Sequence, residues 1–243
     1  MGQLKGQTCV VTGASGGLGR CIALTLARAG GQIVIASRNQ QASQRVVEEI
    51  ESFGGKGLSL PTDVTNEAQV QETFAKVLES FGGLDLLINN AGLALGGAPD
   101  ELSFETWKQV LGVNLDGAFL CSREALRLMK PKRRGRIINI GSVSAKVPRI
   151  NSAPYTTSKF ALEGLTKALA LDARPFGISV SILHPGNTDT PIWDSRRSVA
   201  EEEGVMNPDE VARLVLAMAA LPPDINFLEG TVLPLSMPFL GRG

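Results

Sequence analysis

The sequence predicts an α/β fold in which one doubly wound domain holds a seven-stranded, mostly parallel sheet flanked by helices. Short runs rich in Val, Ile and Leu alternate with longer stretches of helical period along the whole chain, and this alternation is typical of βαβ units and parallel sheets. The chain has no internal repeat and no low-complexity linker. We therefore expect its 243 residues to form a single Rossmann-type domain.

The predicted elements follow one another in strand–helix order. Glycines at positions 30, 54 and 82 mark the ends of the first three helices, where glycine readily adopts the left-handed conformation. Strands are expected at residues 7–12, 32–37, 57–60, 84–89, 136–140, 178–183 and 230–233. Helices are expected at residues 18–29, 40–53, 67–81, 103–129, 155–174 and 208–221.

The composition argues against several functional classes. The chain has 24 basic and 24 acidic residues, so no net charge attracts nucleic acid. No uninterrupted apolar run approaches the roughly 18 residues of a membrane span, and we expect a cytoplasmic protein that does not bind membranes. Cys9, Cys21 and Cys121 lack metal-ligand spacing, so we expect free thiols and no metal site.

A glycine-rich turn separates the first strand from the first helix. Glycines let the backbone approach a phosphate closely, and the helix N-terminus stabilises the anion. We therefore expect a dinucleotide's pyrophosphate to lie against Gly13, Ser15, Gly16, Gly17, Leu18 and Gly19. The spacing is GxxxGxG rather than the dinucleotide fingerprint GxGxxG, so a tight connection without a ligand remains the alternative.

The end of the second strand indicates which dinucleotide is bound. It reads Ser37-Arg38-Asn39 and carries no carboxylate, whereas an acidic residue at this edge usually accepts the adenosine ribose hydroxyls of NAD. Arg38 can pair with a 2′-phosphate, and Ser37 and Asn39 can donate hydrogen bonds to it. We therefore expect NADP(H), with an ordinary solvated arginine as the alternative.

Four side chains form a candidate reacting centre. Tyr155 and Lys159 are four residues apart in a helical stretch and so share one face, where a lysine ammonium would favour the phenolate of a group that titrates near pH 10. Ser142 follows the fifth strand at the sheet edge where such folds bind ligands. Asn114 lies inside the predicted helix 103–129, where asparagine has below-average propensity.

These segments together resemble the short-chain dehydrogenase/reductase family, of the single-domain kind to which 3-oxoacyl-carrier-protein reductases are similar. The glycine turn resembles the family's TGxxxGxG motif, and Asn114, Ser142, Tyr155 and Lys159 match its catalytic tetrad in order and spacing. The other matching segments are the adenine-contacting pair Asp63-Val64, the NNAG segment Asn89-Asn90-Ala91-Gly92 and the nicotinamide-side pair Pro185-Gly186.

The resemblance implies an oxidoreductase that moves a hydride between NADP(H) and a carbonyl or alcohol carbon. It implies that Tyr155 is the general acid or base, that Ser142 polarises the substrate oxygen, that Lys159 lowers the Tyr155 pKa and holds the nicotinamide ribose, and that Asn114 anchors a proton relay. It further implies cofactor contacts at Asp63, Val64, Asn90, Ala91, Gly92, Pro185, Gly186 and Thr188.

The substrate is expected to be a mostly apolar, neutral ketone or secondary alcohol. It should lie against residues 93–96, 144–151 and 192–193, below a lid at about residues 187–206 in which Trp193 covers an apolar ligand. His184, the only histidine, is interpreted as a packed or hydrogen-bonded imidazole rather than a general base.

Three alternatives to this function remain. The first is a 3-oxoacyl-acyl-carrier-protein reductase, which Arg133 favours and Phe176 disfavours. The second is a catalytically silent NADP-binding regulator, which retention of all four catalytic residue types disfavours. Dehydratase or epimerase chemistry is the third, and the short chain disfavours it. We also expect a homotetramer, from the resemblance and from the many apolar positions of the two long helices.

Overall fold

A computed structural model of the chain describes residues 2–190 and 203–238. Within these residues seven strands form one sheet in the order β3-β2-β1-β4-β5-β6-β7, and every neighbouring pair is parallel. The predicted fold class is therefore confirmed. The strands are β1 (Thr8–Thr12), β2 (Gln32–Ser37), β3 (Lys56–Pro61), β4 (Leu86–Asn89), β5 (Gly135–Ile140), β6 (Ile178–Pro185) and β7 (Glu229–Val232).

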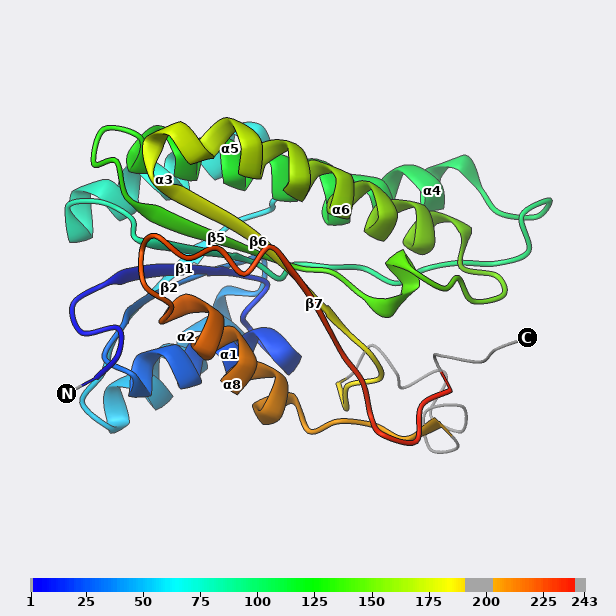
Figure 1. Cartoon of the computed structure of the whole chain (residues 1–243), viewed down its shortest axis with the longest axis horizontal. Coiled ribbons are helices and arrows are strands. Elements are labelled where there is room, and N and C mark those ends of the chain that lie inside the picture. The colour runs from blue at the N-terminus through cyan, green and yellow to red at the C-terminus, as the bar shows by residue number, and fades with distance from the viewer. Residues whose placement is uncertain (1, 191–202, 239–243) are drawn as a thin grey trace.

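Helices cover both faces of this sheet. Figure 1 shows α3, α5 and α6 on one face and α1, α2 and α8 on the other. The α-helices are α1 (Gly17–Arg28), α2 (Gln40–Ser52), α3 (Glu67–Phe81), α4 (Phe104–Leu111), α5 (Gly117–Met129), α6 (Ala153–Ala173) and α8 (Pro208–Ala219). Shorter turns are the π-helix η1 (Gly112–Asp116) and the 3-10 turns η2 (Val143–Ala145) and η3 (Arg174–Phe176).

The two larger apolar cores lie between the sheet and its helices. Along β1, Cys9 and Val11 face the core that α1 and α8 cover, whereas Val10 faces the core beneath α3 and α5. Both faces of the strand are buried, as is typical of a parallel sheet between two helical layers. This explains why the predicted strands read as continuous apolar runs.

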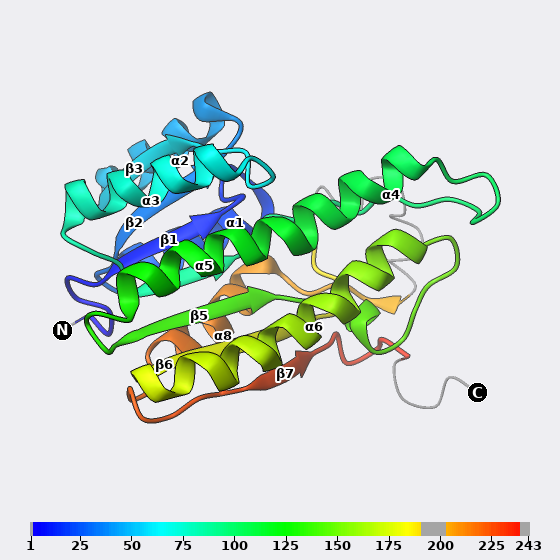
Figure 2. The same cartoon turned by 90° about the horizontal axis from the view of Figure 1, so that it is seen from above.

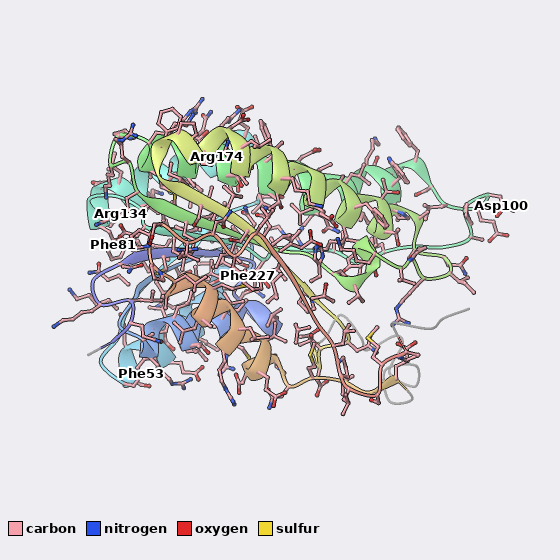
Figure 3. All side chains as sticks on the ribbon, viewed as in Figure 1. Phe53, Phe81, Asp100, Arg134, Arg174 and Phe227 are labelled. Atoms are coloured by element: carbon pink, nitrogen blue, oxygen red, sulfur yellow. The ribbon has the colours of Figure 1, made fainter. Side chains whose placement is uncertain are left out.

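The strand order reverses direction between β1 and β4. Open α/β sheets bind ligands at such a switch point, beyond the carboxyl ends of the strands. The turn after β1 and the loop after β4 meet there, because Thr12 accepts hydrogen bonds from the backbone N–H groups of Asn90 and Ala91, both at 3.0 Å. Figure 3 shows Asp100 at the tip of the long β4–α4 loop, well away from the strands.

The expected single helix at 103–129 is wrong in one respect. Figure 2 shows α4 and α5 continuing each other as one rod, but the five-residue π-helix η1 lies between them and contains Asn114. There the Gly117 N–H donates to the Gly112 carbonyl instead of the carbonyl four residues back. Hydrophobic period does not reveal a single wide turn, so the sequence predicted a regular helix.

No described helix combines the length and apolar character needed to cross a membrane.

Candidate active site

A cavity of about 690 Å³ opens at the carboxyl edge of the sheet. Most residues predicted for the site line it: Gly13, Ser15, Gly16, Gly17, Leu18, Ser37, Arg38, Asp63, Val64, Asn90, Ala91, Gly92, Ser142, Tyr155, Lys159, Pro185, Gly186 and Thr188. Three predicted residues, Gly19, Asn39 and Asn114, lie outside the lining. The structure therefore brings the glycine turn and the Tyr155 region into one continuous space.

The glycine turn requires glycine at two positions, because a side chain there would clash with the loop after β4. Gly13 has a φ of +65°, and a Cβ there would lie 2.8 Å from the Cα of Ala91. A Cβ on Gly19 would lie 2.4 Å from the side-chain nitrogen of Asn90. Gly13 and Gly19 thus let the turns after β1 and β4 pack together, whereas Gly16 has open space at its Cβ position. The N-terminus of α1 is left open towards the cavity, as anion binding there requires.

The end of β2 presents an unpaired cation to the cavity. Arg38 is exposed and lines the cavity, and its guanidinium has no ion pair or hydrogen bond within the described part of the chain. Ser37 donates a hydrogen bond to the Ser15 hydroxyl at 3.0 Å. Asn39 instead caps α2, where its side chain accepts a hydrogen bond from the Ala42 N–H at 3.0 Å. This local role explains why Asn39 does not line the cavity.

Tyr155 and Lys159 meet Ser142 across the cavity. Both belong to α6, and Ser142 directly precedes η2. Lys159 Nζ lies 5.6 Å from the centre of the Tyr155 ring and donates to the Ile140 carbonyl at 2.8 Å. The three side chains therefore form one cluster at the ends of β5 and α6.

Burial controls the protonation of this cluster. The pKa of Tyr155 is raised by burial, and its hydrogen bond with Ser142 acts in the lowering direction. Burial also lowers the pKa of Lys159 from 10.5 to about 8, because no carboxylate offsets the lost hydration. The hydrogen bond with Ser142 favours the phenolate, and the expected effect of Lys159 on the Tyr155 pKa stays a prediction.

Asn114 connects the β4 loop to α6. Its buried amide accepts from the Leu93 N–H at 2.7 Å and donates to the Leu93 carbonyl at 3.0 Å and to the Ser158 hydroxyl at 2.9 Å. A Cβ on Gly92 would lie 3.7 Å from Asn114 Oδ1 and 3.9 Å from Lys159 Nζ. Asn114 thus lies beside the lysine, just behind the cavity wall.

The remaining lining is more polar than the sequence led us to expect. Of the predicted substrate segments, Ala94, Leu95, Gly96, Ser144, Arg149 and Asn151 line the cavity. Arg149 forms a salt bridge with Glu203 and donates to the Asn187 amide oxygen at 3.1 Å. Sequence reasoning missed this polar cluster, because Arg149 and Glu203 are 54 positions apart and no local motif connects them. Ile192, Trp193 and the rest of the expected lid from 191 to 202 lie outside the described residues.

His184 lies behind Ser142 rather than in the cavity. Its side chain is fully buried, and its Nδ1 atom lies 3.0 Å from the Ser142 carbonyl oxygen and 3.3 Å from the Ser142 backbone nitrogen. Burial lowers its pKa, although the Ser142 backbone and two nearby carboxylates act in the opposite direction. This agrees with the interpretation of a packed, hydrogen-bonded imidazole.

Comparison with known proteins assigns this arrangement to a family. The family described as short chain dehydrogenase matches residues 7–201. The chain belongs to that family. A short-chain type dehydrogenase/reductase from Mycobacterium marinum has a solved structure that superposes with a TM-score of 0.92 at 30% identity, covering 98% of this chain and 97% of that one.

Two relatives of the short-chain dehydrogenase family indicate the reaction class. One is a 3beta-hydroxysteroid dehydrogenase of Mediterraneibacter gnavus, 38% identical over 80% of this chain and 70% of that protein. The other is a 3-dehydrosphinganine reductase of Danio rerio, 31% identical over 88% of this chain and 68% of that protein. The protein is accordingly an oxidoreductase of carbonyl or alcohol groups that uses a nicotinamide cofactor, NAD or NADP.

Proposed function

We propose that this enzyme interconverts a ketone and a secondary alcohol with NADP(H), and that Tyr155 is its general acid and base. The observation that carries the proposal is a single cavity with an unpaired Arg38 beside the glycine turn at one end and the Tyr155, Ser142 and Lys159 cluster at the other. A pocket that only binds an apolar ligand has no need of a buried lysine beside a half-buried phenol.

The residues that line the cavity support the binding of NADP(H). The open N-terminus of α1 suits the pyrophosphate, and Arg38 with Ser37 suits the 2′-phosphate that distinguishes NADP from NAD. Asp63 and Val64, which we assign to the adenine, and Pro185, Gly186 and Thr188, which we assign to the nicotinamide, all line the cavity. When bound, the nicotinamide supplies or accepts the hydride.

In the reducing direction, the Tyr155 hydroxyl gives its proton to the substrate oxygen as the carbonyl carbon gains the hydride. Ser142 donates a hydrogen bond to the same oxygen and so stabilises the negative charge that develops on it. In oxidation the proton returns to Tyr155. Lys159 lines the cavity beside Tyr155, and Asn114 donates to Ser158 of the same helix from outside the lining, which supports a role for them in restoring the proton from solvent.

The test is a panel of ketones, 3-oxoacyl thioesters, sugars and steroids, followed by NADPH absorbance. Tyr155→Phe should lower kcat by at least about 100-fold while the NADPH Kd changes by less than about twofold, because only the hydroxyl is lost. Thr157→Ala, on an exposed position of the same helix, is the control and should keep wild-type kcat.

Each result of the panel separates the alternatives. A preference for 3-oxoacyl thioesters would favour the carrier-protein reductase function. NADPH binding without turnover of any compound would favour a regulatory protein. A Tyr155→Phe variant that keeps more than about a tenth of wild-type kcat would refute the role of Tyr155.

We further infer that the enzyme is a homotetramer that acts on a small molecule. Phe119 on α5 and Phe160 and Leu171 on α6 are exposed, and these two helices pack next to each other on one face of the sheet (Figure 2). Exposed apolar side chains on adjacent helices favour burial against a second subunit.

A further inference from the structure

A charged cluster lies behind Ser142, outside the cavity. Glu163 of α6 and Glu229 of β7 both lie beside Nε2 of His184 on β6, and Lys146 contacts both carboxylates. Lys167 also pairs with both, from the more exposed side. Two carboxylates and two ammonium groups therefore neutralise each other around one imidazole.

Only one of the two imidazole nitrogens forms hydrogen bonds. Nδ1 contacts the Ser142 backbone, whereas Nε2 is buried and has no hydrogen-bond partner among the described residues. Nε2 lies 3.7 Å from Glu163 Oε2 and 3.7 Å from Glu229 Oε1. An orphaned buried polar atom requires an explanation.

The charges around the ring select one of its two neutral tautomers. Two carboxylates near Nε2 favour a proton on that nitrogen, since an N–H dipole directed at negative charge is stabilised. Nδ1 then carries the lone pair and accepts a hydrogen bond from the Ser142 N–H at 3.3 Å. This lone pair also faces the Ser142 carbonyl oxygen at 3.0 Å, but one neutral carbonyl dipole opposes the Nε2–H form less strongly than two carboxylates oppose a lone pair at Nε2. With the other tautomer, a lone pair at Nε2 would face two carboxylates.

A bound metal ion would satisfy Nε2 equally well, but Lys146 argues against one. Its ammonium already lies within 2.7 Å of Glu163 Oε2 and also contacts Glu229, which is the place a cation between the two carboxylates would take. The two ammonium groups already balance the charges of the two carboxylates, so the cluster needs no metal ion.

We propose that His184 is a positioning residue that holds the Ser142 turn in place, and that Glu163 and Glu229 fix its Nε2–H tautomer. The proposal rests on the function proposed above, in which Ser142 binds the substrate oxygen.

The geometry of the turn connects His184 to the reacting centre. A Cβ on Gly141 would lie 2.5 Å from Nδ1, so glycine at this position is what allows the ring to approach the backbone before Ser142. Glu163 lies one helical turn after Lys159 on α6. The cluster therefore ties the Ser142 turn to the helix that carries Tyr155.

The tautomer can be measured without any activity. Because the chain has a single histidine, nitrogen-15 labelled histidine gives one unambiguous pair of ring signals. We expect a neutral ring with the proton on Nε2 between about pH 6 and 8, and a shift towards the Nδ1–H form in the double variant Glu163→Gln, Glu229→Gln. The exposed carboxylate variant Glu72→Gln is the control and should leave the signals unchanged. An Nδ1–H ring in the wild type would overturn the proposal.

Kinetics test the effect on Ser142. His184→Leu should lower kcat by about tenfold or more, the size of loss typical of a misplaced reacting group, with the NADPH Kd changed by less than about twofold. His184→Asn should recover most of the loss, because its side-chain amide can reach the place of Nδ1. Ser181→Ala is the matched control: Ser181 is also buried in β6, and this change removes its bond to Asn226 without touching Ser142.

A pH profile separates positioning from simple loss of stability. Without a well-placed Ser142, Tyr155 loses the hydrogen bond that lowers its pKa, so the rise of the oxidation rate with pH should move to higher pH in His184→Leu. The charged groups that bear on this profile are Lys146, Glu163 and Glu229 around His184, and Lys159 beside Tyr155.

Two outcomes would reject the positioning role. The first is a His184→Leu enzyme that matches Ser181→Ala in kcat and pH profile. If the leucine variant does not fold, the second outcome applies, which is a His184→Asn enzyme with less than about a tenth of wild-type kcat. If Tyr155→Phe remained active, the proposed function would fail while the tautomer measurement stayed valid, so the two failures are distinguishable.

Discussion

Replacing Lys159 by methionine should stabilise the cofactor-free protein at neutral pH while removing its activity. Methionine has nearly the length of lysine and similar helix propensity, so the change mainly removes a charge. Lys159 is buried, and the one hydrogen bond that the structure gives its ammonium is to the Ile140 carbonyl at 2.8 Å. A buried ammonium without a carboxylate partner lowers stability.

The size of the effect follows from the pKa. In the folded protein burial lowers the Lys159 pKa from 10.5 to about 8, and a depression of this size corresponds to about 3 kcal/mol of lost stability when both states are protonated. Methionine gives up the hydrogen bond to Ile140, which costs about 1 kcal/mol. We therefore expect Lys159→Met to raise the free energy of unfolding at pH 7 by about 2 kcal/mol.

The gain should depend on pH in a defined direction. Below pH 8 both the folded and the unfolded wild type carry the proton on Lys159, and the full penalty applies. As the pH rises from about 8 towards 10.5, the folded protein loses this proton first, so the unfolded state binds more protons and wild-type stability rises. The advantage of the variant should therefore shrink over this range.

Urea unfolding of both proteins at about pH 7 and pH 10 measures the difference. Lys76→Met, which removes an exposed lysine paired with Glu72, should change stability by less than about 1 kcal/mol at either pH. A Lys159→Met protein that is less stable than wild type at neutral pH, or whose advantage does not change with pH, would refute the reasoning.

The remaining predictions concern the cofactor and the assembly. We expect kcat/KM for NADPH to exceed that for NADH by about tenfold or more, because the exposed Arg38 can form a charge-assisted pair with the 2′-phosphate. The double variant Ser37→Asp, Arg38→Ala should reverse this preference at low ionic strength. The control is Arg45→Ala, which removes an exposed arginine of α2 and should leave the preference unchanged. Equal wild-type values would show that Arg38 does not bind the phosphate. Light scattering at micromolar concentration should give the mass of a tetramer, and a monomeric mass would contradict the predicted assembly.

Local patterns in the sequence were sufficient to predict the sheet. The inner strands β1, β4, β5 and β6 are short runs buried on both faces, and helical stretches separate the strands, so the hydrophobic period and the turn residues together define the βαβ units. The predicted boundaries differ from the observed ones by at most two residues, for example at β6, which continues to Pro185. Such ends depend on pairing with a neighbour, in this case β7, which the local sequence does not encode.

Some residues of the site could likewise be predicted from local sequence, whereas others depend on contacts between distant positions. Gly13, Tyr155 and Lys159 could be predicted because turn geometry and helical spacing are properties of adjacent residues. The contact of His184 with Ser142 joins residues 42 positions apart, and the Arg149–Glu203 salt bridge joins residues 54 apart. Neither leaves a local pattern, since both are created by the order of strands in the sheet.

The π-helix η1 has a consequence for how related sequences are compared. A single added residue rotates everything beyond it by about 100° around the helix axis, and π-turns of this kind often mark functional positions. The repeat of apolar positions on α4 is therefore rotated about the helix axis relative to the repeat on α5, although residues 104 to 129 form one continuous rod. Side chains on α4 pack against α6, whereas Cys121, Ala125 and Met129 keep α5 on the sheet. Deleting one residue from 112–116 would put both helices in one phase and would turn α4 away from the surface it now covers.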